Sequence, residues 1–136
     1  MDVAAALERL REISSQVRAA VIFERGGKVV GSTLADEERA KQVAEEAEAL
    51  LREAEQRSDR PDGGDFAQLE VALQAGSVFV VRDGERLIAA TSPPEPTVGL
   101  VFYDLKSCLR GAKAEKAKAE PAAPKRRRKK EPGAQT

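Results

Sequence analysis

The 136-residue sequence contains no histidine, no tryptophan and a single cysteine, Cys108. Without histidine, no imidazole can act as a general acid or base, and no His-ligated metal site can form. One cysteine excludes an internal disulfide framework and a thiolate cluster. Because a lone thiol suits a reducing compartment, we expect a cytoplasmic protein.

Signals for export or membrane insertion are missing as well. The N-terminus, Met1–Val3 followed by Glu8, has neither the basic start nor the long apolar stretch of a secretory signal. Apolar runs of about 18 residues, which a membrane-spanning helix needs, do not occur. We therefore expect neither a secretory signal nor a transmembrane segment.

Large apolar side chains are scarce, and their distribution divides the chain. Only five residues are aromatic, all of them before residue 111, whereas alanine accounts for 23 residues. A body of this size can bury roughly two-thirds of its unfolded surface. The sequence therefore predicts one small domain over residues 1–110. Residues 111–136 contain no aromatic or branched aliphatic residue, and we expect them to form a disordered tail.

The formal net charge of zero hides two parts of opposite sign. Basic and acidic residues number 23 each, but residues 111–136 hold nine basic and three acidic ones, a net charge of +6. Residues 1–110 therefore carry a net charge of −6. The chain is an acidic body followed by a basic tail.

The spacing of apolar residues predicts three helices and five strands. Helical spacing occurs over residues 2–16, 37–57 and 97–110. Asp2 is expected to cap the first helix, and Gly111 is expected to stop the last one. Short apolar or alternating runs predict strands at 17–24, 28–33, 69–73, 78–81 and 86–91. The first of them is apolar on both faces, so we expect a central strand covered on both sides. The order α-β-β-α-β-β-β-α indicates an α/β protein of the α+β sandwich type. We expect one five-stranded, mostly antiparallel sheet with helices on both faces.

The long helix predicted over residues 37–57 has one apolar side and one acidic side. Its N-terminal cap is either Thr33, in a capping box with Asp36, or Asp36 itself. The apolar stripe consists of Ala40, Val43, Ala44, Ala47, Leu50, Leu51 and Ala54. The opposite side, which we expect to be solvated, carries Glu45, Glu46, Glu48 and Glu53.

Several short segments in this order resemble a known family. They are Leu7–Leu10, the strand Arg18–Glu24 with the following Arg25-Gly26-Gly27, the helix start Leu34–Glu38, and the segments Gly76–Arg82 and Thr97–Leu105. Together with the order of helices and strands, they resemble the Roadblock family (dynein light chain type) over about residues 5–110. The short chain is more similar to the stand-alone bacterial members than to the dynein-linked ones.

The resemblance implies a non-enzymatic scaffold that dimerises and binds or regulates a small Ras-like GTPase. Family members dimerise through the long helix and the adjacent edge strand, which here is Leu69–Leu73, and an open edge strand is itself an association site. The predicted homodimer interface consists of Ala40, Val43, Ala47, Leu50, Leu51, Ala54, Leu69, Val71 and Leu73. The alternative is that the helix stripe only covers its own sheet.

If the protein stimulates GTP hydrolysis, an arginine supplied in trans is the simplest chemistry. Arg18, Arg25, Arg82 and Arg86 lie near predicted turns or strands, and the sequence selects none of them. Indirect positioning of the switch loops of the GTPase is equally open.

Three patterns that could suggest chemistry have simpler interpretations. Arg25-Gly26-Gly27-Lys28 lacks the spacing of a phosphate-binding loop and links two strands, so we expect a hairpin turn. Cys108 lies on the apolar stripe of the last helix and is expected to be a buried structural thiol. Asp62 and Asp65 lack the ligand ladder of a calcium loop. We expect no enzymatic activity, no metal site and no cofactor.

The tail contains six consecutive basic residues, Lys125, Arg126, Arg127, Arg128, Lys129 and Lys130. They could dock on nucleic acid or an anionic membrane, contact an acidic partner, or fold back onto the acidic body. The leading hypothesis is a homodimer that binds a small GTPase. The alternative is a dimeric accessory protein tethered to nucleic acid or an anionic membrane through this tail.

Overall fold

The computed structural model describes residues 2–57 and 66–119, with side chains as far as Ala112. It contains the predicted helices and strands in the predicted order. Their bounds are α1 (Val3–Ile13), β1 (Ala19–Glu24), β2 (Lys28–Ser32), α2 (Glu37–Gln56), β3 (Phe66–Leu73), β4 (Gly76–Asp83), β5 (Arg86–Ser92) and α3 (Val98–Ala119).

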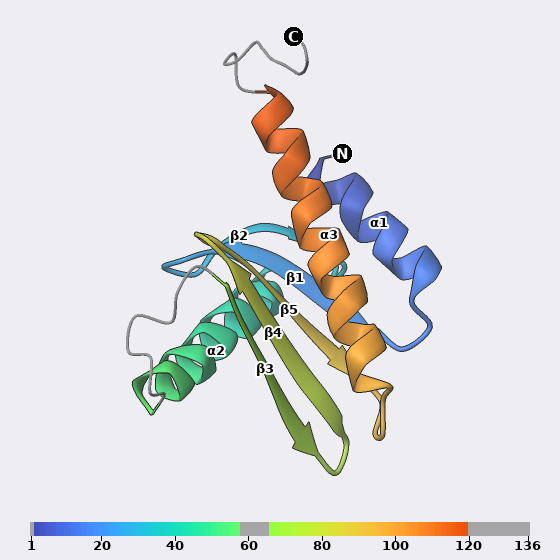
Figure 1. The fold of residues 1–136 in the computed structure, drawn as a ribbon, viewed down its shortest axis with the longest axis vertical. Coiled ribbons are helices and arrows are strands. Elements are labelled where there is room, and N and C mark those ends of the chain that lie inside the picture. Colours follow the sequence, from blue (N-terminus) through green and yellow to red (C-terminus); the bar gives the residue numbers. More distant parts are fainter. Residues whose placement is uncertain (1, 58–65, 120–136) are drawn as a thin grey trace, which may run out of the picture.

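The five strands form one antiparallel sheet in the order β2-β1-β5-β4-β3. Helices α1 and α3 lie side by side on one face, and α2 crosses the other face (Figure 1). The chain leaves the sheet at one edge strand, β2, and returns through α2 to the other edge strand, β3. The predicted sandwich with helices on both faces is confirmed.

An apolar cluster on each face holds the layers together, and β1 contributes to both. Its residues Ala20 and Ile22 pack with α1 and α3, whereas Val21 and Phe23 pack with α2. All four are at most 1% exposed. Alternation along a strand sends neighbouring side chains to opposite faces, so a strand that is apolar at every position is covered on both sides. The prediction of a central strand is confirmed.

Side-chain caps begin two of the helices. The Asp2 carboxylate accepts a hydrogen bond from the Ala5 amide at 2.7 Å at the start of α1. Of the two caps considered for α2, Asp36 is the one present, because its carboxylate accepts from the amides of Glu38 and Arg39 at 3.0 and 3.3 Å. The Thr33 hydroxyl instead accepts a hydrogen bond from the Ala20 amide at 2.9 Å, which links the segment before α2 to β1.

The last helix differs from its prediction. Instead of stopping at Gly111, α3 continues to Ala119. Ala112 is 1% exposed and belongs to the core, so the first turn beyond the glycine is held by packing. The following alanine, lysine and glutamate residues are good helix formers, and they outweigh the cost of about 1 kcal/mol for an internal glycine. Within the described ranges, no helix is long and apolar enough to cross a membrane.

Candidate interaction surface

The apolar stripe of α2 divides into two rows. Ala40, Ala44, Ala47 and Leu51 are at most 4% exposed and pack against the sheet. An amphipathic helix with a period of about 3.6 residues packs its apolar side on the core, and this row is that side of α2. Three of the residues predicted to form the dimer interface, Ala40, Ala47 and Leu51, therefore pack on the sheet of their own chain.

The second row stays partly open to solvent. Val43 and Ala54 are half-buried, and Leu50 is 39% exposed. These positions are seven and four residues apart, so they lie along one side of the helix. They form the part of the predicted helix interface that remains accessible in a single chain.

Three leucine and valine side chains of β3 point to the face of the sheet that α2 covers, whereas Phe66 packs on the opposite face. Leu69 packs with the cluster under α2, and alternation puts Val71 and Leu73 on the same face. Helix α2 packs across β2, β1 and β5. Towards the end of β3, Val71 is therefore half-buried and Leu73 is 59% exposed.

The two edges of the sheet differ in how well they are protected. The edge strand β2 has five residues, its register shifts opposite Ile22 and Phe23, and α1 packs onto its Gly31. By contrast, β3 pairs with β4 over eight consecutive positions without a shift. It contains no lysine, arginine or proline, and its one charged residue is Glu70. Bulges, charges and covering elements protect an edge from pairing, so β3 is the edge open to association.

We call the open edge of β3, together with the side chains of Val43, Leu50, Ala54, Val71 and Leu73, the β3–α2 surface. The predicted position of this strand at a sheet edge is confirmed. Five of the nine predicted interface residues thus lie on accessible parts of one face. The remaining four, Ala40, Ala47, Leu51 and Leu69, connect this surface to the core.

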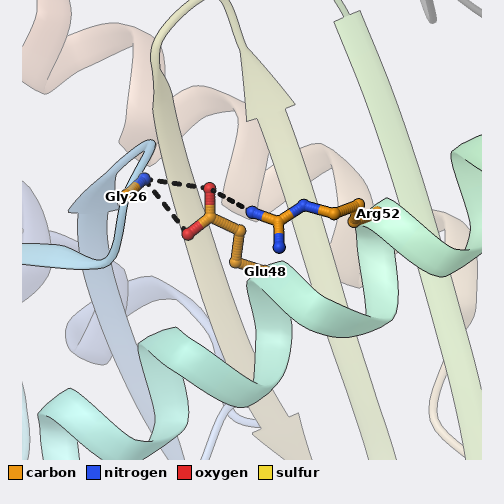
Figure 2. Close-up of polar contacts among 3 residues, drawn as sticks. All are labelled: Gly26, Glu48 and Arg52. Carbon is orange, nitrogen blue, oxygen red and sulfur yellow. Dashed lines mark hydrogen bonds and ion pairs between the residues drawn. The ribbon is translucent and has the colours of Figure 1, made fainter.

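The glycine turn between β1 and β2 is held by α2 rather than left open for a phosphate. Both Gly26 and Gly27 have positive φ angles, 96° and 92°, which favour glycine. The Gly26 amide donates to both carboxylate oxygens of Glu48, at 3.1 and 2.9 Å (Figure 2). Arg52 pairs with the same carboxylate at 3.7 Å. The predicted hairpin is confirmed.

This contact corrects the prediction for one of the four glutamates of α2. Glu45, Glu46 and Glu53 are exposed as predicted, but the Glu48 side chain is only 13% exposed. The reason is that Glu48 lies at the border between the acidic side of α2 and the side that faces the hairpin. The sequence offers no signal for the contact, because the two partners are 22 positions apart.

The structure separates the four candidate arginines into two groups. The Arg82 side chain is 4% exposed and donates to Glu55 at 2.8 Å. The Arg86 side chain is 11% exposed and contacts Glu24 at 3.4 Å. Pairing and burial keep these two guanidinium groups from reaching a partner protein. Arg18 and Arg25 are exposed, and they are the candidates that remain accessible.

The single thiol has the predicted structural role. Cys108 is 7% exposed, and its Sγ donates to the backbone oxygen of Ala6 at 3.4 Å. Desolvation by burial raises the pKa of this thiol to about 12. The contact links α3 to α1 in the core.

Two of the predicted features lie outside the described residues. These are the loop with Asp62 and Asp65, and the basic segment Lys125–Lys130.

Comparison with known proteins assigns a family to this arrangement. The sequence model of the Roadblock/LC7 domain matches residues 4–92. This range runs from the start of α1 to the end of β5. A comparison with curated proteins finds no significant match.

Several solved structures share the fold at low sequence identity. The Roadblock/LC7 domain from Streptomyces avermitilis superposes with a TM-score of 0.72 at 21% identity, covering 86% of this chain and 99% of that one. Myxococcus xanthus MglB has a TM-score of 0.63 at 13% identity, with coverages of 85% and 95%. For the gliding protein MglB of Thermus thermophilus the values are 0.59 and 17%, with coverages of 85% and 88%.

Proposed function

Because this chain belongs to the Roadblock/LC7 family, we propose that it is a homodimeric regulatory protein that binds a small Ras-like GTPase. In this function the chain contributes a binding platform and no covalent chemistry. The observation that carries the proposal is the β3–α2 surface, an open eight-residue edge strand beside accessible apolar side chains.

The chemistry of this surface supports dimerisation. Two copies of β3 related by a two-fold axis would pair antiparallel and extend the sheet across both chains. The same two-fold axis brings the accessible row of each α2, Val43, Leu50 and Ala54, towards the other chain. The dimer would thus cover apolar side chains and unpaired backbone groups of β3 together. Leu50 and Leu73 are the largest exposed apolar side chains on this surface, at 39% and 59%.

Binding of a GTPase rests on the family. The resemblance to Roadblock proteins implies that such dimers bind or regulate small Ras-like GTPases. A likeness to MglB structures at 13–17% identity supports the shared fold, not the shared partner. Retention of a nucleotide-loaded GTPase identifies the partner, and its rate of hydrolysis gives the direction of regulation.

Substitutions at Leu73 and Leu100 test the dimer. Leu73→Lys places a charge in the proposed interface and is expected to raise the dimer dissociation constant at least tenfold, measured by sedimentation equilibrium. Leu100→Lys changes an equally apolar side chain, 49% exposed on α3, on the other face, and should leave the constant unchanged. A monomer at micromolar concentration in the unaltered protein would contradict the dimer.

The GTPase interaction is tested with purified Ras-like proteins from the same cell, loaded with GDP or with a non-hydrolysable GTP analogue. We expect one of them to be retained by the immobilised protein, with a preference for one nucleotide state. If none is retained in either state, while the dimer persists, GTPase binding is refuted and the dimer is not.

A trans-arginine mechanism would require one of the two accessible arginines. If the retained GTPase is also stimulated, Arg18→Ala or Arg25→Ala should lower the stimulated rate about 10³-fold or more without abolishing binding. Stimulation that survives both changes would assign catalysis to the GTPase's own residues, positioned by this protein. Arg82→Ala is not a suitable control, because it removes the ion pair between β4 and Glu55 of α2.

A further inference from the structure

A groove of about 430 Å³ lies between α1 and α3. Arg9, Ile13 and Ser107 on its lining are exposed, so it opens to solvent. At one end, it is lined by the small residues Ala6 and Gly111. Because α1 and α3 cover the face of the sheet opposite α2, the groove is separate from the β3–α2 surface (Figure 1).

Asp104 lines this groove and is an unusual residue for its surroundings. It is only 8% exposed, yet within residues 2–57 and 66–119 its carboxylate has no hydrogen bond and no ion pair. Arg82 is the other buried charged residue in this part of the chain, and it is paired with Glu55. Neither carboxylate oxygen is among the fully buried polar atoms that lack a partner, so the carboxylate opens into the groove, where it favours a ligand that brings a cation.

We propose that the basic segment Lys125–Lys130 of the same chain docks in this groove and places one cation against Asp104. Two observations favour this occupant over a foreign one. The segment supplies six cations in succession, and the body that it would contact carries a net charge of −6. Because the segment is tethered to the same chain, its effective concentration at the groove is high, whereas a separate partner would have to be supplied at a comparable concentration.

The length of the chain allows this contact. Asp104 lies 15 residues before the end of α3 at Ala119, or about 22 Å along the helix axis. Lys125 and Lys130 follow Ala119 by 6 and 11 residues, which can span up to about 20 and 36 Å when extended. A cation from this segment can therefore reach the Asp104 carboxylate without any change in α3.

The direction of the helices also suits a returning chain. Figure 1 shows the C-terminal half of α3 passing the start of α1. A chain that returns from the end of α3 meets Gly111 and Ala6 first, where small side chains leave room for backbone, and then Asp104. Arg9 lines the same groove and is the cation that competes for Asp104.

Zero-length cross-linking of the full chain tests the docking. A carbodiimide joins a carboxylate to a lysine amine only when the two are in contact, and peptide mass spectrometry identifies the pair. We expect an amide between Asp104 and Lys125, Lys129 or Lys130, formed within one chain when labelled and unlabelled protein are mixed. The cross-link should disappear in Asp104→Asn and decrease at least fivefold in 0.5 M NaCl, because salt screens the contact.

Control variants separate docking from random collision of the tail. Glu12→Gln removes an exposed carboxylate on α1 and should leave the Asp104 cross-link unchanged, and Arg9→Gln should preserve or increase it. Cross-links distributed over exposed glutamates with none at Asp104 would overturn the proposal. So would cross-links to Asp104 that form only between chains.

A second measurement does not depend on the folding of an Asp104 variant. In the full-length chain, Lys125, Arg126, Arg127, Arg128, Lys129 and Lys130 are each changed to Gln, which leaves the described core intact. Amide NMR shifts should then move along α1 and α3 beside the groove, and not along α2. Unchanged shifts beside the groove would overturn the proposal.

Discussion

Gly31 shows how a single residue sets the distance between a helix and an edge strand. A Cβ atom at this position would lie 2.3 Å from Val3 Cγ1 and 3.1 Å from Leu7 Cδ1. Both contacts come from α1, so only a residue without a side chain lets α1 pack onto β2. The close approach holds α1 against β2.

Gly31→Ala should therefore destabilise the protein by about 1–3 kcal/mol, the usual cost of overpacking, in urea unfolding. Gly99→Ala is the matched control, because a Cβ there meets nothing within 4 Å. It should leave stability unchanged or raise it by up to about 1 kcal/mol. Val3→Ala in the Gly31→Ala background should recover part of the loss. An unaltered stability of Gly31→Ala would contradict the packing described.

The thiol of Cys108 provides a prediction for pH. Its pKa is about 12 in the folded chain against 9.0 for the ordinary thiol. Well below pH 9, the thiol is protonated in both states and contributes almost no pH dependence. Between about pH 9 and 12, the unfolded chain loses this proton first, so stability falls as pH rises.

At pH 8, the folded protein should react with a disulfide reagent such as DTNB at least a hundredfold more slowly than the protein in 6 M guanidinium chloride. The reactive thiolate is scarce in the folded chain, and the sulfur is buried. Rapid labelling of the native protein, with its circular dichroism unchanged, would contradict this environment of Cys108.

At the scale of elements, α2 and the β1–β2 hairpin are joined by one carboxylate. Glu48 accepts both of its hydrogen bonds from the Gly26 amide, which lies in a turn with positive φ (Figure 2). A backbone amide in such a turn has no strand partner, so the helix supplies one. The contact fixes the hairpin end of the sheet against α2.

Glu48→Ala should lower the free energy of unfolding by about 1–2 kcal/mol, the scale of a charge-assisted hydrogen bond that is partly solvated. Amide hydrogen exchange at Gly26 should become faster in the same variant. Glu46→Ala changes an exposed glutamate of the same helix and should have little effect on either quantity. Equal effects of the two variants would show that the Glu48 contact does not stabilise the fold.

Element boundaries were predictable where a local signal acts alone. Asp2 and Asp36 cap helices as their positions before apolar-periodic segments predict, and the glycine turn forms a hairpin. The end of α3 was not predictable from Gly111, because burial of Ala112 decides whether the helix continues. The burial of Ala112 depends on the packing of α3 against α1 and the sheet, and the local sequence around Gly111 does not predict that packing.

At the scale of the whole molecule, the fold places two separate surfaces on opposite faces. The β3–α2 surface combines an open edge with accessible apolar side chains, and the groove between α1 and α3 is lined by Asp104. Occupation of one surface does not obstruct the other. A dimer formed through β3 would therefore leave the groove between α1 and α3 of each chain accessible.

If the protein is a dimer, its thermal stability must depend on its own concentration. Each tenfold increase favours the folded dimer by about 1.4 kcal/mol per dimer, so the Tm should rise by roughly 2–4 °C. Leu73→Lys should show a smaller dependence, and Leu100→Lys the same dependence as the unaltered protein. A Tm independent of concentration from 1 to 100 μM would contradict a folding-coupled dimer.

The sequence by itself determined the order of helices and strands, the central position of β1, the hairpin turn and the structural role of Cys108. These depend on periodicity, capping and turn chemistry, which act over a few neighbouring residues. Only the tertiary structure decided which residues of α2 are accessible, since Leu50 and Leu51 are equivalent in the sequence pattern but differ in exposure, 39% against 4%. It also decided that Arg82 is paired with Glu55, whereas Asp104 has no ion pair with another residue that the structure describes. Those outcomes depend on which distant segments meet, and that is set by the packing of the two helix layers on the sheet.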